Sequence, residues 1–126
     1  MTDKTQVNVR RVYEKPEPGD GCRVLVDRLW PRGVSKEEEN WDEWLKDVAP
    51  STELRRWYGH DPAKFTEFRR RYAEELGEPG HSAAFTHLRD LAQSGPLTLL
   101  TSTRDAAHSE ADVLAELLNE GAAPGA

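Results

Sequence analysis

Cysteine is nearly absent from this chain of 126 residues. Cys22 is its only cysteine, so neither an intrachain disulfide nor a cysteine-based metal cage can form. No apolar run approaches the ~20 residues that span a bilayer, and we therefore expect no membrane association. The first residues lack the apolar core of a signal peptide, which predicts a cytoplasmic location.

Positive charge is also in short supply. Lysine and arginine number 17 against 23 acidic residues, and the net charge of −6 disfavours general nucleic-acid binding. The sequence contains no GxGxxG or Walker-type loop, no nucleophile-elbow motif and no C-x-x-C pair. No two histidines have a recognised metal-ligand spacing, and no basic helix stands out as a DNA-recognition helix. We therefore predict no metal, no cofactor and no nucleic-acid partner.

The apolar residues, although they make up only 37% of the chain, are clustered and periodic. Clustering of this kind is typical of a folded chain rather than a disordered one, and the length fits one domain. We expect residues 1–120 to form a single domain. Residues 121–126 are small or proline and offer nothing to bury, so they are expected to form a flexible tail.

Three segments have the composition of strands: 7–13, 23–28 and 97–101. The second contains a run of apolar residues with little polar alternation, as in a strand whose two faces are both covered. The connection at 14–22 is short for a helical crossover, so the first strand is predicted to run antiparallel to the second or to lie at an edge. Cys22 precedes the second strand and is interpreted as a small packing residue.

Helical spacing of apolar residues follows in four stretches, at 41–48, 51–58, 61–76 and 82–94, and a last helix is expected after Ser109. The first stretch carries Trp41 and Trp44, which we expect in the core. Apolar strands separated and followed by helices predict an α/β fold: a single-domain layered structure with a small, mostly parallel sheet flanked by helices.

The most informative segment is VLVDRLWPRG at 24–33, where an apolar strand ends in an acid and two arginines. If strands 23–28 and 97–101 are parallel neighbours, their carboxyl ends share one rim, where ligands bind in such sheets. The last helix would direct its unpaired N–H groups to this rim, which favours a phosphate, sulfate or carboxylate group. The side chains expected to gather there are Asp27, Arg28, Arg32, Ser102, Arg104, Asp105 and His108.

Several blocks resemble the YeaO-like branch of domain-of-unknown-function family 488. They include VLVDRLWPRG at 24–33, WLKD at 44–47, WYGHD at 57–61 and FRRRY at 68–72, and the resemblance extends from residue 7 to 118. It implies a small bacterial cytoplasmic α/β protein and adds Lys46 to the candidate ligand residues.

The family pattern has a lysine, an aspartate and a histidine after the last strand. Arg104 stands in place of that lysine, while Asp105 and His108 match. Arginine keeps the positive charge but cannot serve as a tunable base. Longer relatives carry a cysteine near the end of this strand, where this chain has Thr101, and this difference argues against thiol chemistry.

Each candidate also has a purely structural interpretation. Arg28 and Arg32 either bind ligand or pair with the acids at 37–39. Asp27 is expected to orient an arginine rather than to catalyse. Lys46 either binds ligand or extends its amine into solvent along the tryptophans.

The aromatic and imidazole candidates have alternatives too. Trp57 lines a pocket wall or belongs to the core. His60 and His108 are either titratable groups in the cleft or polar residues packed at helix starts. His81 and His87 are expected on the surface, and the arginines at 69–71 are expected to be solvated or salt-bridged.

These observations favour binding of a small anionic ligand, bearing phosphate or carboxylate, in a basic and aromatic cleft at the rim. A hydrolase or transferase would use His60, His108 or Asp27 as acid or base. A non-catalytic sensor or protein-interaction module would use the same rim without proton transfer, and both alternatives remain open from the sequence. A DNA-binding regulator is disfavoured. The predicted ligand residues are Arg28, Arg32, Lys46, Trp57, His60, Ser102, Arg104, Asp105 and His108.

Overall fold

A computed structural model describes residues 7–121 of the chain. Its sheet has the order β1-β4-β2-β3, and every neighbouring pair is parallel. The strands are β1 (Val7–Arg11), β2 (Cys22–Leu25), β3 (Glu43–Trp44) and β4 (Leu97–Thr101). The helices are α1 (Thr52–Tyr58), α2 (Phe65–Glu75), α3 (Pro79–Ser94) and α4 (Glu110–Glu120). The predicted α/β fold is thus confirmed, whereas the predicted tail lies, beyond residue 121, outside the described residues.

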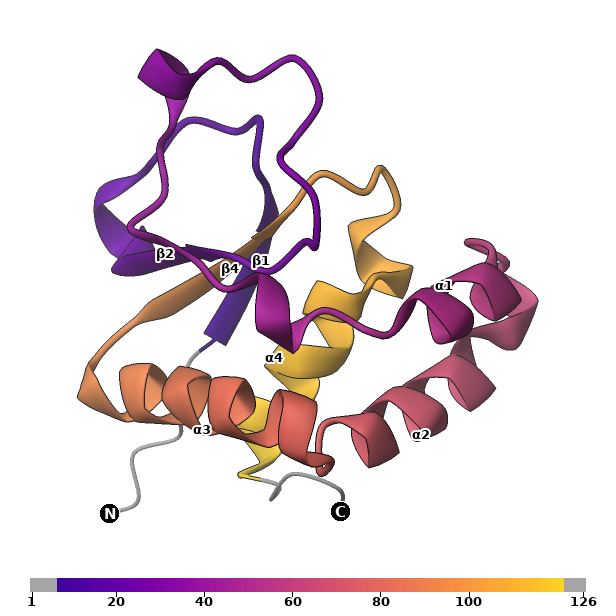
Figure 1. The fold of residues 1–126 in the computed structure, drawn as a ribbon. Coiled ribbons are helices and arrows are strands. Elements are labelled where there is room, and N and C mark those ends of the chain that lie inside the picture. The colour runs from indigo at the N-terminus through magenta and orange to yellow at the C-terminus, as the bar shows by residue number, and fades with distance from the viewer. Residues whose placement is uncertain (1–6, 122–126) are drawn as a thin grey trace.

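The two faces of the sheet are covered differently, with helices on one side and long loops on the other (Figure 1). Alternate strand residues point to opposite faces, so Val24 and Leu99 join the helix-side core while Leu25 and Leu100 join a second core. The second core is completed by Trp41, with Trp30 and Trp44 packed against it, as expected for Trp41 and Trp44. On the helix side, half-buried Cys22 packs against the core, in agreement with its interpretation as a packing residue.

The first strand was predicted either to lie at an edge of the sheet or to run antiparallel to the second. β1 does lie at an edge, and the antiparallel alternative is wrong. β1 pairs in parallel with β4, and β4 separates it from β2. The ten-residue connection 12–21 can reach about 33 Å when extended, and β2 rises only about 13 Å. A loop with one 3-10 turn, Pro18–Asp20, therefore returns the chain to the start of β2 without an α-helix.

The predicted helix at 41–48 is wrong. Glu43 and Trp44 form β3, and a short 3-10 turn, Lys46–Val48, follows. Hydrogen bonds to β2 and the residues after it hold this segment in the extended conformation. Leu45 N donates to Leu25 O at 2.8 Å, and the Trp44 indole N–H donates to Asp27 O at 2.7 Å. The tryptophan spacing that imitates a helical stripe serves the second core instead, a case of tertiary packing overriding local propensity.

The remaining helices are confirmed, and their caps explain where they begin and end. Ser51 Oγ accepts from Leu54 N at the start of α1, and Gly59 ends that helix with φ +55°. Ser109 caps α4 in the same manner. α3 begins three residues earlier than expected, because Pro79 occupies its first turn in place of a cap by Ser82.

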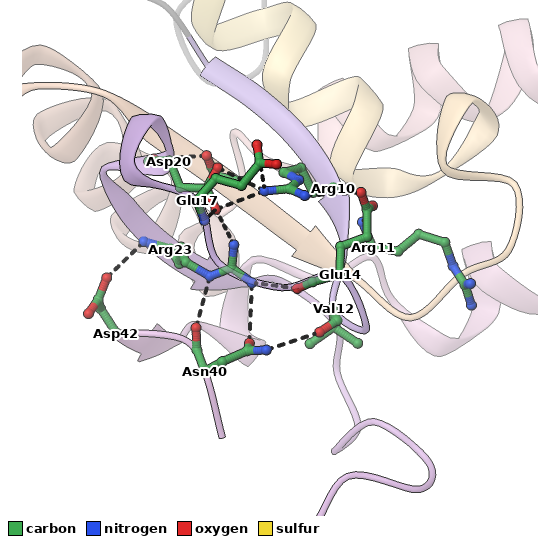
Figure 2. A network of polar contacts seen from close by, with 10 residues as sticks. Arg10, Arg11, Val12, Glu14, Glu17, Asp20, Arg23, Asn40 and Asp42 are labelled. Atoms are coloured by element: carbon green, nitrogen blue, oxygen red, sulfur yellow. Dashed lines mark hydrogen bonds and ion pairs between the residues drawn. The ribbon is translucent and has the colours of Figure 1, made fainter. Parts of the chain in front are cut away.

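A buried network of charges attaches the long loops to the second face of the sheet. The Asp20 carboxylate accepts from the guanidinium groups of Arg10 in β1 and Arg23 in β2 (Figure 2). Arg23 also donates from Nε to Asn40 O at 2.8 Å, which attaches the loop leading to β3. Burial acts to raise the pKa of Asp20, but hydrogen bonds from the Glu17 N–H and the two arginines outweigh it and lower the pKa.

Replacing Asp20 with asparagine should lower the free energy of unfolding by about 3 kcal/mol, because it leaves Arg23 buried without its charge partner. Since the folded pKa of Asp20 is lowered, this stabilisation is complete above the unfolded pKa and is lost as the pH falls through the folded pKa. Urea denaturation at neutral and acidic pH would measure both effects. The exposed Asp47→Asn variant is the control, and equal stability of the two variants at pH 7 would contradict the prediction.

Candidate functional site

The parallel pairing of β2 with β4 brings the ends of the two strands to one rim, as predicted. Val26 N donates to Leu100 O at 3.1 Å, and beyond this backbone hydrogen bond the two strands diverge. Immediately beyond it, the Asp27 carboxylate accepts from Thr101 Oγ1 at 2.8 Å and from Ser102 N at 2.7 Å. Asp27 and Ser102, about seventy-five residues apart in sequence, are therefore in direct contact.

Two adjoining cavities open at this rim, and both are bordered by Pro50, Arg55, His60 and Glu110. The smaller has a volume of about 290 Å³ and is polar; its other lining residues are Asp27, Arg28, Leu29, Trp30, Arg32, Ala49, Ser102 and Thr103. The larger, about 390 Å³, is more aromatic; its other lining residues are Thr52, Arg56, Tyr58, Phe68, His108 and Ser109. Because they share these four lining residues, the two adjoining cavities are together called the rim site below.

Of the predicted ligand residues, Arg28, Arg32, His60, Ser102 and His108 border the rim site. The other four border neither of its cavities: Lys46, Trp57, Arg104 and Asp105.

These four residues have other surroundings. The exposed Lys46 lies over the Trp44 ring at 5.3 Å. Trp57 is packed by the cationic groups of Arg71, at 4.2 Å, and Lys64, at 5.2 Å, and borders a separate cavity. Arg104 is exposed.

Asp105 acts on a neighbouring site residue instead of lining the rim site. Its carboxylate lies 2.7 Å from His108 Nδ1, and both side chains are partly exposed. Asp105 thereby fixes the orientation of the imidazole that borders the larger cavity. His60 is oriented by its backbone, since it adopts a left-handed conformation with φ 56° directly after the end of α1.

The arginines of the rim site have few protein partners. Within residues 7–121, neither Arg28 nor Arg32 forms an ion pair, so the structure gives no support to their pairing with the acids at 37–39. Sequence reasoning missed Arg55, which borders both cavities. Its Nε is buried and has no hydrogen-bond partner among the described residues, while its Nη2 donates to Thr52 Oγ1 at 3.3 Å. The one signal in the sequence for a site role of Arg55 was its position two residues before the WYGHD block.

Glu110, the first residue of α4, is the second residue that sequence reasoning missed. It borders both cavities, and Thr101 Oγ1 lies 3.4 Å from its carboxyl oxygen. Burial, followed by the adjacent Asp27 carboxylate, raises the pKa of Glu110 well above its usual range. The rim therefore holds two adjacent acids, and the surroundings of Glu110 favour its protonated form. No local motif could reveal this, because the pair forms only when α4 packs beside the end of β2.

Aromatic side chains form the wall of the larger cavity. Tyr58 stacks on Phe68 with ring centroids 4.2 Å apart and donates its hydroxyl to His108 O at 2.6 Å. Burial and then the nearby carboxylates of Asp105, Asp61 and Glu110 raise the pKa of Tyr58 to about 12. The hydroxyl therefore remains a neutral donor that joins α1 to the turn before α4.

Two other sequence interpretations concern residues outside the rim site. The arginines at 69–71 are salt-bridged, for example Arg69 to Glu116 at 2.6 Å, as expected. The surface interpretation of His81 is wrong: its ring is partly buried and its Nε2 lies 3.1 Å from Ala49 O. His87 is partly exposed and lies 2.8 Å from Glu43.

The described part of the chain contains no cluster of three or more histidine, cysteine or acidic side chains placed to hold a metal ion. Within the same part, none of the helices has the length and apolar character needed to cross a membrane.

Comparison with known proteins places this architecture in a family. A profile described as the inactive DUF488-N3 subclade matches residues 6–124. The chain belongs to this subclade. It is 52% identical over 119 residues to the uncharacterized protein Rv3073c of Mycobacterium tuberculosis, covering 94% of this chain and 98% of that protein. It is 42% identical over 112 residues to the uncharacterized protein YeaO of Escherichia coli, covering 89% and 96% respectively. No solved structure gives a significant match.

For this DUF488-N3 chain, replacing Tyr58 with phenylalanine should lower the free energy of unfolding at pH 7 by about 1 kcal/mol, because His108 O loses its donor. The folded pKa of about 12 exceeds the usual value of 10.0, so wild-type protein loses stability as the pH rises from the lower value to the higher. The variant lacks this contribution and should lose less over that interval. Urea denaturation at pH 7, 10 and 11 would measure the difference, and parallel curves would contradict the assigned pKa.

Proposed function

We propose that the rim site binds a small anionic ligand, bearing a phosphate or carboxylate group, without catalysing a reaction on it. The observation that carries the proposal is Arg55, whose buried Nε has no partner within residues 7–121 although it borders both cavities. An unsatisfied buried donor on a permanent cation is costly unless an acceptor arrives. An anionic oxygen in either cavity would pair with the charge of the Arg55 guanidinium.

The charges around the smaller cavity support the same conclusion. Arg28, Arg32 and Arg55 contribute three positive charges and outnumber the two acids, Asp27 and Glu110, of which Glu110 has a raised pKa. The cavity is therefore positive inside a protein whose net charge is −6. A local field of this sign attracts anions although the protein as a whole repels them.

The larger cavity indicates what else the ligand carries. Its wall includes the rings of Tyr58, Phe68 and His108, which suit an apolar or planar group. A ligand with an anionic end between the arginines and an apolar body beside Tyr58 would fill both parts of the rim site. We also propose that the protein acts in the cytoplasm, as the N-terminal sequence and the family resemblance lead us to expect.

Two observations favour binding over hydrolase or transferase chemistry. First, the DUF488-N3 subclade to which the chain belongs is described as inactive. The Ser102 hydroxyl donates to Asp27 at 2.8 Å, and no imidazole is hydrogen-bonded to Ser102 or Thr103 within residues 7–121, so neither hydroxyl has a histidine base. A non-catalytic sensor of the anion is therefore preferred to an enzyme.

Replacing Arg55 with methionine should weaken binding of inorganic phosphate about 10- to 100-fold, the loss expected for one charge-assisted hydrogen bond. Methionine keeps most of the side-chain packing, and isothermal titration calorimetry measures the affinity. The matched control is Arg70→Met, on the exposed face of α2 and paired only with Glu67 and Glu74. Equal phosphate affinity in wild type and the Arg55 variant would overturn the proposal.

Alanine at Arg28 or Arg32 should abolish phosphate binding while leaving the fold largely intact. Both side chains are exposed and neither forms an ion pair within residues 7–121, so their loss removes charge from the cavity without opening a core. Circular dichroism and the thermal midpoint would check the fold alongside the calorimetry. Unchanged phosphate binding in both variants would remove these arginines from the site.

A further inference from the structure

The hydrogen bonds around Asp27 and Glu110 differ between the two acids. Asp27 accepts three hydrogen bonds: from the Thr101 hydroxyl, the Ser102 N–H and the Ser102 hydroxyl. The Thr101 hydroxyl has only one proton and lies closer to Asp27, at 2.8 Å, than to Glu110, at 3.4 Å. Where the two acids share one proton, burial and the adjacent Asp27 favour its placement on Glu110.

The positions of the two acids make this proton a property of the binding site. Glu110 borders both cavities, and Asp27 borders the arginine-lined one. A protonated Glu110 can donate to Asp27, and the pair then carries a single negative charge facing Arg28, Arg32 and Arg55. Loss of that proton would place a second negative charge where the proposed anion binds.

We infer that Glu110 determines the specificity of the rim site by proton-coupled binding: the site accepts an anion only while Glu110 and Asp27 share a proton. The inference rests on the proposed function and adds its dependence on pH. Anion affinity is expected to be highest at mildly acidic pH and to fall as the shared proton is lost, because like charges repel inside a partly desolvated cavity.

Other titratable groups surround the pair and must be separated from it. The fully buried Tyr72 of α2 donates its hydroxyl to Val48 O and remains neutral, because burial raises its pKa well above the usual range. His60 and His108 also border the site. The remaining charged or titratable groups are Arg28, Arg32, Arg55, Arg56, Tyr58, Asp61, Asp105 and, on α4 itself, Asp112.

The test uses Glu110→Gln with sulfate as the probe, since sulfate keeps the same charge throughout the working range. Glutamine has the shape of the protonated acid, and its amide can still donate to Asp27, so the variant should fold. Calorimetry from pH 5.5 to 8.5 should show wild-type affinity falling about tenfold more than that of the variant. The other titratable groups are common to both proteins, so the comparison isolates Glu110. Glu116→Gln, on the same helix and paired with Arg69 of α2, is the matched control and should follow wild type.

The outcomes separate the two proposals. Sulfate binding by wild type with the same pH profile in the Glu110 variant would overturn this inference and leave the proposed function standing. Absence of sulfate binding by wild type at every pH would overturn both. Carbon-13 NMR of the glutamate carboxyl groups supplies a readout that needs no ligand: the Glu110 signal should titrate well above the other glutamates. Titration in the ordinary range would overturn the inference by itself.

Discussion

The rim site depends on one constraint, the parallel pairing of β2 with β4. Val24, Leu25 and Val26 are fully buried, as are Leu99 and Leu100, so apolar burial fixes both strands in register. A shift of one residue would reverse every side chain between the two cores. Because the register is fixed, the first polar residue after each strand emerges at the same level, where Ser102 donates to Asp27. The contact between the two segments is thus a consequence of core packing.

The second core holds the loop that carries two arginines of the site. The connection from β2 to β3 contains Arg28 and Arg32, and between them the Trp30 ring lies 5.0 Å from that of Trp41 and 5.7 Å from that of Trp44. The Trp30 indole N–H also donates to Val34 O at 2.6 Å, which closes the loop on itself. Edge-to-face aromatic contacts of this kind stabilise a loop beyond the area that they bury. Tryptophans on the face away from the helices therefore position Arg28 and Arg32, whereas the third arginine of the smaller cavity, Arg55, comes from α1.

The sequence predicted what depends on local pattern and missed what depends on tertiary contact. Apolar strands, caps such as Ser51 and Ser109, and the meeting of Asp27 with Ser102 followed from burial patterns and strand direction. The segment around Trp44 was mistaken for a helix, because spacing alone does not tell a helical stripe from aromatics that serve a second core. Arg55 and Glu110 were missed because nothing in the sequence showed that their side chains face the rim.

The candidates after β4 show a related limit of sequence reasoning. Proximity along the chain placed Arg104, Asp105 and His108 together at the rim, yet of these three His108 alone borders the two cavities of the rim site. The turn that joins β4 to α4 directs the Arg104 and Asp105 side chains towards solvent. The residue that enters both cavities is instead the first of the following helix. Segment position was thus predictable, and side-chain direction within the turn was not.

The contacts of Asp27 and Glu110 also suggest what the rim site does in a subclade described as inactive. Catalysis requires a group whose protonation changes along a reaction, next to a nucleophile. The rim has the first, in Glu110 beside Asp27, but its strand-end hydroxyls at Thr101 and Ser102 are donors to Asp27. Those same hydrogen bonds direct the Ser102 and Thr101 hydroxyl protons to Asp27, beside the buried Glu110. Hydroxyl groups engaged in this way are poor nucleophiles, which is why the proposed function is the binding of an anion and not a reaction on it.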